Sequence, residues 1–211
     1  MVKIKAVLFD MDGVLIEAKD WHYEALNKAL GLFGYEITRA EHLSSYDGLP
    51  TKVKLKKLTL EKGLPVELHG FINEMKQQYT VGIIQNQCRP RFNHEYCLSK
   101  LRANGYSVAC CSNSIRMTIE MMMNYAKLDK YLNFIISNQD VTNAKPDPEI
   151  KLTAMKKLNL PPQECLIVED NENGIKAATA SGGHLLAVKT VDDVTWDNVI
   201  GRIKEIEQGG R

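Results

Sequence analysis

The first apolar segment of the chain is short and ends in acidic residues. Residues 6–9 read Ala-Val-Leu-Phe, and Asp10, Met11, Asp12 and Gly13 follow them. A run of four apolar residues that meets a glycine-containing turn is typical of a buried strand. The pattern therefore predicts a strand over 6–9 with carboxylates at its carboxyl end.

The next part of the chain has helical spacing. Apolar residues recur every three or four positions over 21–33 behind Asp20, a candidate N-cap, and Gly34 ends the pattern. Further helices are expected over 52–62 and 68–79. We therefore expect the segment from residue 17 to 85 to be helical, without a convincing strand.

Strands and helices alternate after residue 90. The apolar runs are short and have no polar alternation, which is typical of parallel strands buried on both faces. This order predicts an α/β fold, a doubly wound parallel sheet with helices on both faces, and a separate small helical domain inserted after the first strand. The expected strands are 108–111, 134–136, 166–168 and 185–188, and the expected helices are centred on 97–101, 115–126, 148–158 and 174–180.

Composition excludes several classes of protein. The chain has 211 residues, of which 44% are hydrophobic and 25% charged, which are globular values. Its formal charge of +1 gives no field that would recruit nucleic acid or an anionic membrane, so we expect neither as a partner. Five cysteines without zinc-site spacing indicate reduced thiols, and we expect a monomer in the cytoplasm.

The chemistry-bearing residues follow the expected strands. Right-handed crossovers place the carboxyl ends of all parallel strands at one edge of the sheet, where ligands bind. Polar side chains just after a strand are therefore the candidate site residues. They are Asp10 and Asp12, then Ser112, Asn113 and Ser114, then Asp140 and Lys145, and finally Glu169 and Asp170.

This set of side chains suits phosphoryl transfer. Carboxylate oxygens hold Mg²⁺, and lysine and hydroxyl groups bind phosphate oxygens. Taken singly, an Asp-x-Asp-Gly segment is often only a turn, Lys145 a solvated loop residue, and Glu169-Asp170 a helix cap. An EF-hand is excluded because Val14 and Trp21 occupy two ligand positions. The joint placement of these residues at successive strand ends favours a catalytic site.

Four segments resemble the motifs of the haloacid dehalogenase-like hydrolase superfamily. The resemblance spans about residues 3–189, and the helical insertion is similar to the cap of the β-phosphoglucomutase-like subgroup. It implies a Rossmann-like core over 1–16 and 86–211 and a helical cap over 17–85. The four segments are Phe9-Asp10-Met11-Asp12-Gly13-Val14-Leu15, Ser112-Asn113-Ser114, Lys145-Pro146-Asp147-Pro148, and Val168-Glu169-Asp170 with Gly174-Ile175 behind it.

The resemblance implies a role for each core residue. Asp10 would attack phosphorus and form an aspartyl-phosphate, while Asp12 would protonate the leaving oxygen and then activate water. Ser112 and Asn113 would hold the phosphoryl group, and Lys145 would neutralise it and pair with Asp10. The resemblance further implies a Mg²⁺ ion as cofactor. Its expected ligands are Asp10, the main-chain carbonyl of Asp12, Asp170, and Glu169 directly or through water.

The helical insertion supplies the expected substrate contacts. His22 stands where the subgroup often has a histidine, and Gly48 opens a loop that usually has the form Gly-x-x-Arg. Here Thr51 takes the place of that arginine and Lys52 follows it. A lysine grips a second phosphate less well than a bidentate arginine, so this difference disfavours a bisphosphate-holding mutase.

We therefore expect a Mg²⁺-dependent phosphatase that acts on a small phosphorylated metabolite, with sugar phosphates as the first class to test. A β-phosphoglucomutase-type phosphotransferase is the alternative within enzymes. A non-catalytic phosphate-binding module is a further alternative, although both Asp10 and Asp12 are present. Dehalogenation is disfavoured because that chemistry needs neither Asp12 nor the Glu169-Asp170 pair.

Overall fold

The structure is a computed structural model that describes residues 2–209. Its contacts divide the chain into two compact units. One consists of Met1–Glu17 with Arg89–Arg211, and the other of Ala18–Cys88. The sequence places the inserted segment at 17–85, and the helical unit occupies nearly the same residues.

The first unit is built on one parallel sheet. Its five strands lie in the order β3-β2-β1-β4-β5 and all pair in parallel. This arrangement confirms the predicted fold class. The four residues of β1 are fully buried because this strand lies at the centre of the sheet. The strands are β1 (Ala6–Phe9), β2 (Ser107–Cys111), β3 (Phe134–Ile136), β4 (Cys165–Glu169) and β5 (His184–Ala187).

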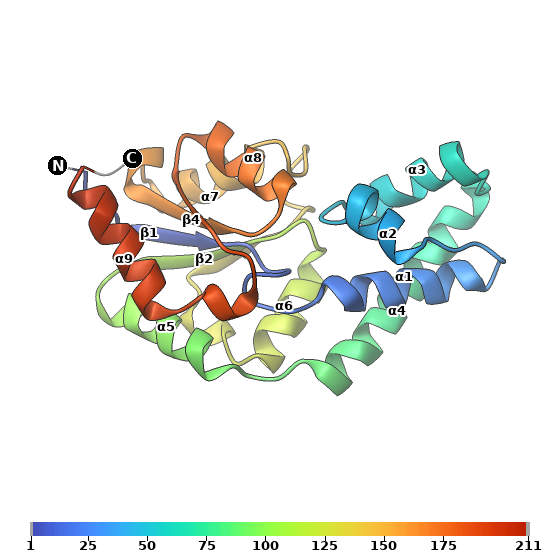
Figure 1. Ribbon diagram of the computed structural model, residues 1–211, viewed down its shortest axis with the longest axis horizontal. Helices are drawn as coiled ribbons and strands as arrows, with labels where there is room; N and C mark the ends of the chain where they lie inside the picture. Colours follow the sequence, from blue (N-terminus) through green and yellow to red (C-terminus); the bar gives the residue numbers. More distant parts are fainter. Residues whose placement is uncertain (1, 210–211) are drawn as a thin grey trace. The chain divides into compact units, whose positions relative to one another are not determined.

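Helices cover both faces of this sheet (Figure 1). Helices α7 (Glu149–Leu158) and α8 (Glu172–Ser181) lie on one face, and α5 (Phe92–Ala103), α6 (Arg116–Tyr125) and α9 (Trp196–Glu207) lie on the other. Alternate strand residues point to opposite faces, so each face buries its own apolar layer. Three single turns of 3₁₀ helix complete the unit: Asp129–Tyr131, Pro162–Glu164 and Val191–Asp193.

Helix α9 is an element that the sequence patterns above did not predict. Its buried residues Val199, Ile203 and Ile206 are spaced three or four apart, and the Thr195 side chain accepts a hydrogen bond from Asn198 N at its start. Both are ordinary helix signals.

The helical unit contains α1 (Lys19–Gly31), α2 (Arg39–Glu41), a π-helical turn (His42–Tyr46), α3 (Thr51–Lys62), a 3₁₀ turn (Val66–Leu68) and α4 (His69–Gln87). The expected N-cap at Asp20 is wrong. Helix α1 begins two residues earlier than expected, at Lys19, with Ala18 as N-cap. Asp20 lies in the first turn, where its negative charge interacts favourably with the positive end of the helix dipole. In the part of the chain that the structure describes, none of the helices has the length and apolar composition needed to span a bilayer.

The core of the helical unit includes a buried histidine. His42 is 1% exposed, and its ring centroid lies 5.1 Å from that of Tyr23. Neither ring nitrogen has a hydrogen-bond partner among the described residues. Burial lowers the pKa of His42 to about 4, and the nearby Lys54 charge adds to this effect against the opposing pull of Asp47.

We expect the free energy of unfolding to decrease as the pH falls from 6.5 to 4, because His42 takes up its proton in the unfolded chain before the folded one does. Urea unfolding of wild-type protein and of the His42→Leu variant at several pH values measures this contribution. The variant should lose less stability than the wild type over that interval. Equal losses in the two proteins would show that His42 does not contribute.

Candidate active site

The backbone at the end of β1 holds Asp10 in a buried position. Asp10 is 4% exposed, and its main-chain N–H donates to the Val168 carbonyl at 3.0 Å. The chain then turns sharply, with the Met11 carbonyl accepting from the N–H groups of Leu15 and Ile16 at 2.9 Å each. Gly13 has φ +85°, a left-handed conformation that favours glycine and makes this turn possible.

Lys145 connects Asp10 to the end of β4. Its Nζ lies 2.7 Å from Asp10 Oδ1 and 2.7 Å from Glu169 Oε1, and all three side chains are buried. The residues are far apart in sequence and meet because β1 and β4 are neighbours. The structure thus brings together Asp10, Lys145 and Glu169 at the edge of the sheet that the sequence identifies.

The charged groups in this cluster shift one another's pKa values. Burial raises the pKa of Asp10 to about 7, helped by the Glu169 charge and opposed by Lys145. Burial alone would raise the pKa of Glu169 and lower that of Lys145, but in each case the opposite charges outweigh it. The pKa of Glu169 is therefore lowered and that of Lys145 raised, so both stay charged at neutral pH.

The segment after β2 supports Lys145 through its main chain. Asn113 Oδ1 accepts from Lys145 N at 3.0 Å, and Asn113 Nδ2 donates to the Lys145 carbonyl at 3.3 Å. Ser112 is 1% exposed, and its Oγ accepts from Ser114 N at 3.1 Å. Asn113 therefore holds the loop that carries Lys145, in addition to the substrate role that the sequence predicts.

Asp12 lies beside the second motif. Its Oδ2 accepts a hydrogen bond from Ser114 Oγ at 3.2 Å, and the residue is partly exposed. Ser114 is thus a hydroxyl next to the carboxylate expected to transfer protons, a contact that the sequence alone does not reveal.

The cluster has a donor set suited to a divalent cation. Asp10, Glu169 and Asp170 each offer a carboxylate oxygen, and these atoms lie within 4.8 Å of one another. Closely spaced anionic oxygens are the ligands that hard cations such as Mg²⁺ take. The residues present therefore fit such an ion.

A second buried lysine, Lys151, belongs to this cluster and was not predicted. It lies on α7 with no exposed surface, and its Nζ is 2.6 Å from Glu169 Oε1. The pattern of α7 contains the signal, since Lys151 stands between the buried Ile150 and Ala154 on the face that packs on the sheet.

Asp140, a candidate from the sequence, lies outside the carboxylate cluster. Both of its carboxylate oxygens accept hydrogen bonds from Arg116 Nη2 at 2.7 Å, and Oδ2 also accepts one from Ser137 N at 2.7 Å. Burial opposes ionisation, but the Ser137 and Arg116 bonds outweigh it and lower the pKa of Asp140 to about 2. Asp140 therefore fastens the start of α6 to the loop after β3.

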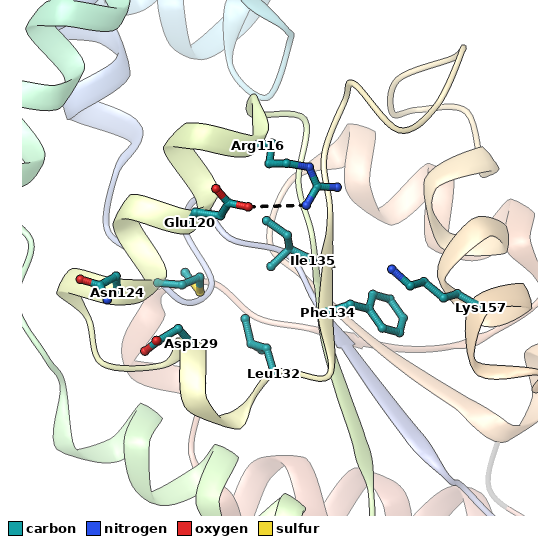
Figure 2. Close-up of a pocket in the computed structure, with 9 residues that line it drawn as sticks. Arg116, Glu120, Asn124, Asp129, Leu132, Phe134, Ile135 and Lys157 are labelled. Atoms are coloured by element: carbon teal, nitrogen blue, oxygen red, sulfur yellow. Dashed lines mark ion pairs between the residues drawn. The ribbon is translucent and has the colours of Figure 1, made fainter.

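A cavity of about 510 Å³ lies next to Arg116, at the edge strand β3. Figure 2 shows Arg116 paired with Glu120 on one side, Phe134 and Ile135 along the strand, and Lys157 beyond them. None of the candidate site residues from the sequence lines it.

The candidate substrate residues of the helical unit have local partners. His22 Nδ1 lies 3.2 Å from Lys76 Nζ on α4, and Gly48 adopts φ +70° in the turn before α3. Lys52 is exposed in the first turn of α3. Lys54 and Lys76 are each 6% exposed, and sequence patterns did not single them out as buried lysines.

Gly174 leaves room for Glu169. A Cβ atom at position 174 would lie 2.0 Å from Glu169 Oε2, far closer than van der Waals contact. The Asn171 side chain caps α8 by accepting from Gly174 N at 3.0 Å, which places the first turn of the helix against that carboxylate. The glycine in the fourth motif is therefore required by close approach.

The sequence and the fold both have relatives among known proteins. The family model described as haloacid dehalogenase-like hydrolase matches residues 7–188. A phosphorylated carbohydrates phosphatase from Thermotoga maritima is 26% identical over 182 residues, with 85% of this chain and 82% of that protein covered. A bifunctional riboflavin kinase/FMN phosphatase from Arabidopsis thaliana is 28% identical over 95% of this chain, and the chain spans 54% of that protein.

Solved structures share the architecture. A β-phosphoglucomutase from Clostridium difficile superposes with a TM-score of 0.84, at 24% identity, over 97% of this chain and 99% of its own. At this identity the likeness concerns the fold alone.

We expect the Gly174→Ala substitution to destabilise the protein by about 2 kcal/mol, because the added methyl group must displace Glu169. The matched control is Gly201→Ala in the middle of α9, where a Cβ meets no atom within 4 Å. That variant should gain about 0.5 to 1 kcal/mol from helix propensity. Urea unfolding measures both, and a stabilised Gly174→Ala protein would contradict the close approach.

Proposed function

We propose that this chain, which belongs to the haloacid dehalogenase-like hydrolase family as a phosphoric monoester hydrolase, releases phosphate from a small phosphorylated metabolite with the help of Mg²⁺. The observation that carries the proposal is the contact of Lys145 Nζ with Asp10 Oδ1 at 2.7 Å, beside two further carboxylates. A buried carboxylate that is held by a lysine and surrounded by cation ligands suits nucleophilic attack on phosphorus.

In the proposed mechanism Asp10 attacks the phosphoryl group and the ester oxygen leaves. Asp12 protonates that oxygen and then takes a proton from the water that hydrolyses the aspartyl-phosphate. The partial exposure of Asp12 and its contact with Ser114 support this role. Ser112 donates to a phosphoryl oxygen, and Lys145 neutralises charge as it develops.

A Mg²⁺ ion would be held by Asp10, Asp170 and the main-chain carbonyl of Asp12. When bound, it would offset the negative charge of the phosphoryl group as it is transferred. Burial among like charges disfavours the ionised form of Asp10 in the metal-free protein. Lys145 counters this effect and holds the carboxylate in place for attack.

A sugar phosphate is the substrate class we favour. The Thermotoga maritima relative named a phosphorylated carbohydrates phosphatase supports it. We further propose that the helical unit selects the substrate through His22, Gly48 and Lys52. Within that unit, the buried Lys54 and Lys76 add positive charge suited to an anionic group.

We also propose that the protein works in a reducing compartment such as the cytoplasm. All five of its cysteines are buried and free of disulfides, and burial raises the pKa of Cys97 and Cys165 to about 12. Such thiols are poorly reactive and are typical of reduced proteins.

Replacing Asp10 with Asn should lower phosphate release by at least ~10³-fold, because the substitution removes the nucleophile. Phosphate release from a panel of sugar phosphates, with and without Mg²⁺, measures this effect. Asp197→Asn, at an exposed position on α9, is the matched control and should retain full activity. Near-normal activity of Asp10→Asn, or turnover that does not need a divalent cation, would contradict the mechanism.

Hydrolysis should exceed isomerisation when the protein is given β-glucose 1-phosphate with a bisphosphate primer. The expected arginine is replaced by Thr51, and Lys52 is exposed, so the chain has no bidentate grip at this position for a second phosphate. A coupled assay compares glucose 6-phosphate with free phosphate. Faster formation of glucose 6-phosphate would establish the mutase in place of the phosphatase.

A further inference from the structure

Two lysines share one carboxylate oxygen beside the candidate nucleophile. Lys151 Nζ lies 2.6 Å and Lys145 Nζ 2.7 Å from Glu169 Oε1, and neither Lys151 nor Glu169 has any exposed surface. The two lysines differ in the carboxylates that they contact. Lys145 also contacts Asp10, whereas the ion pair of Lys151 is with Glu169 alone among the described residues.

The other oxygen of Glu169 is confined by α8. Its Oε2 faces Gly174 so closely that a Cβ atom there would lie 2.0 Å away. One carboxylate oxygen is therefore held by two ammonium groups and the other packs against the main chain of a helix. A Glu169 oxygen already lies within 4.8 Å of ligand oxygens of Asp10 and Asp170, but the lysines compete for Oε1 and α8 confines Oε2. The ion pair with Lys151 therefore opposes direct binding of a cation by Glu169.

The second lysine also changes the charge of the cluster. With all three carboxylates ionised, the form that binds a cation, Asp10, Glu169 and Asp170 carry three negative charges and Lys145 and Lys151 two positive ones, so the net charge is −1. With a neutral residue at 151 it would be −2. The binding of a divalent cation depends strongly on this difference, since charges interact over several ångströms in a buried site.

Packing alone does not require this lysine. A methionine of similar length would fill the same space without the cost of burying an ammonium group. Lys145 already supplies one counter-charge to Glu169. The ammonium group of Lys151 is therefore better explained by its electrostatic effect on the carboxylate cluster than by packing.

We propose that Lys151 is a positioning residue that holds Glu169 away from the cation, leaves Asp10 and Asp170 as the carboxylate ligands, and thereby keeps the affinity for Mg²⁺ moderate. This inference rests on the proposed function, because it assumes that the cluster binds Mg²⁺. A moderate affinity would suit a site in which Asp10 first takes the phosphoryl group from the substrate and then gives it up to water.

The test is the affinity of the metal-free protein for Mg²⁺, measured by isothermal titration calorimetry. Lys151→Met should bind Mg²⁺ at least about tenfold more tightly than wild type, because one positive charge is lost and Glu169 is released. Lys156→Met, the same change at an exposed position of α7, should bind like wild type. A purely structural role for Lys151 would instead leave the affinity unchanged or weaken it, and either result would overturn the proposal.

Two further variants complete the charge series. Glu169→Gln has a net cluster charge of 0 and should bind Mg²⁺ more weakly than wild type. The double variant Lys151→Met with Glu169→Gln returns the charge to −1, removes both members of the buried pair, and should bind within about threefold of wild type. This variant keeps the proposal testable if Lys151→Met alone fails to fold, and a double variant that binds like Glu169→Gln would overturn the proposal.

A readout independent of turnover separates this inference from the proposed function. Thermal unfolding with and without Mg²⁺ should show a larger stabilisation by the cation in Lys151→Met than in wild type. If wild type and all variants bind no Mg²⁺, the inference fails. If the affinities follow the charge series but no phosphate ester is hydrolysed, the proposed function fails and the inference stands.

Discussion

The site depends on one buried ammonium group, that of Lys145, which lies between two carboxylates. Asp10 directly follows β1 and Glu169 ends the neighbouring strand β4, and each is almost completely buried. Two such carboxylates would repel one another and resist ionisation without a cation between them. Lys145 keeps Glu169 charged and orients Asp10, so the proposed nucleophile, the expected cation ligands and the loop that carries the lysine form one electrostatic unit.

The fold supplies the precision that this unit needs. Phe9 pairs with Cys110 on one side and Val168 on the other, so Asp10, the residue after β1, stands level with Cys111 and Glu169, the last residues of β2 and β4. Asn113 then binds both main-chain groups of Lys145, and Asn171 caps α8 next to Glu169. Each support is a side-chain contact to the backbone, which holds the reactive groups without adding charge.

Sequence reasoning recovered the parallel sheet and brought Asp10, Lys145 and Glu169 to one edge, because strand ends and crossover handedness follow from local patterns. It does not predict α9, although the buried residues of this helix have helical spacing, and it assigns the N-cap of α1 to Asp20 instead of Ala18. Lys151 and the reason for Gly174 could not be read locally. Both depend on how α7 and α8 pack around Glu169, which is a property of the tertiary structure.

In the proposed mechanism Asp10 is a covalent nucleophile and not only a base or a cation ligand. The stereochemical course at phosphorus tests this role, using a phosphorothioate ester whose phosphorus carries sulfur, 16O and 18O, hydrolysed in water enriched in 17O, so that the released thiophosphate has four different substituents. Attack by Asp10 followed by attack of water gives two inversions, so we expect the released thiophosphate to show net retention of configuration. Net inversion would mean a single direct attack by water and would contradict the account.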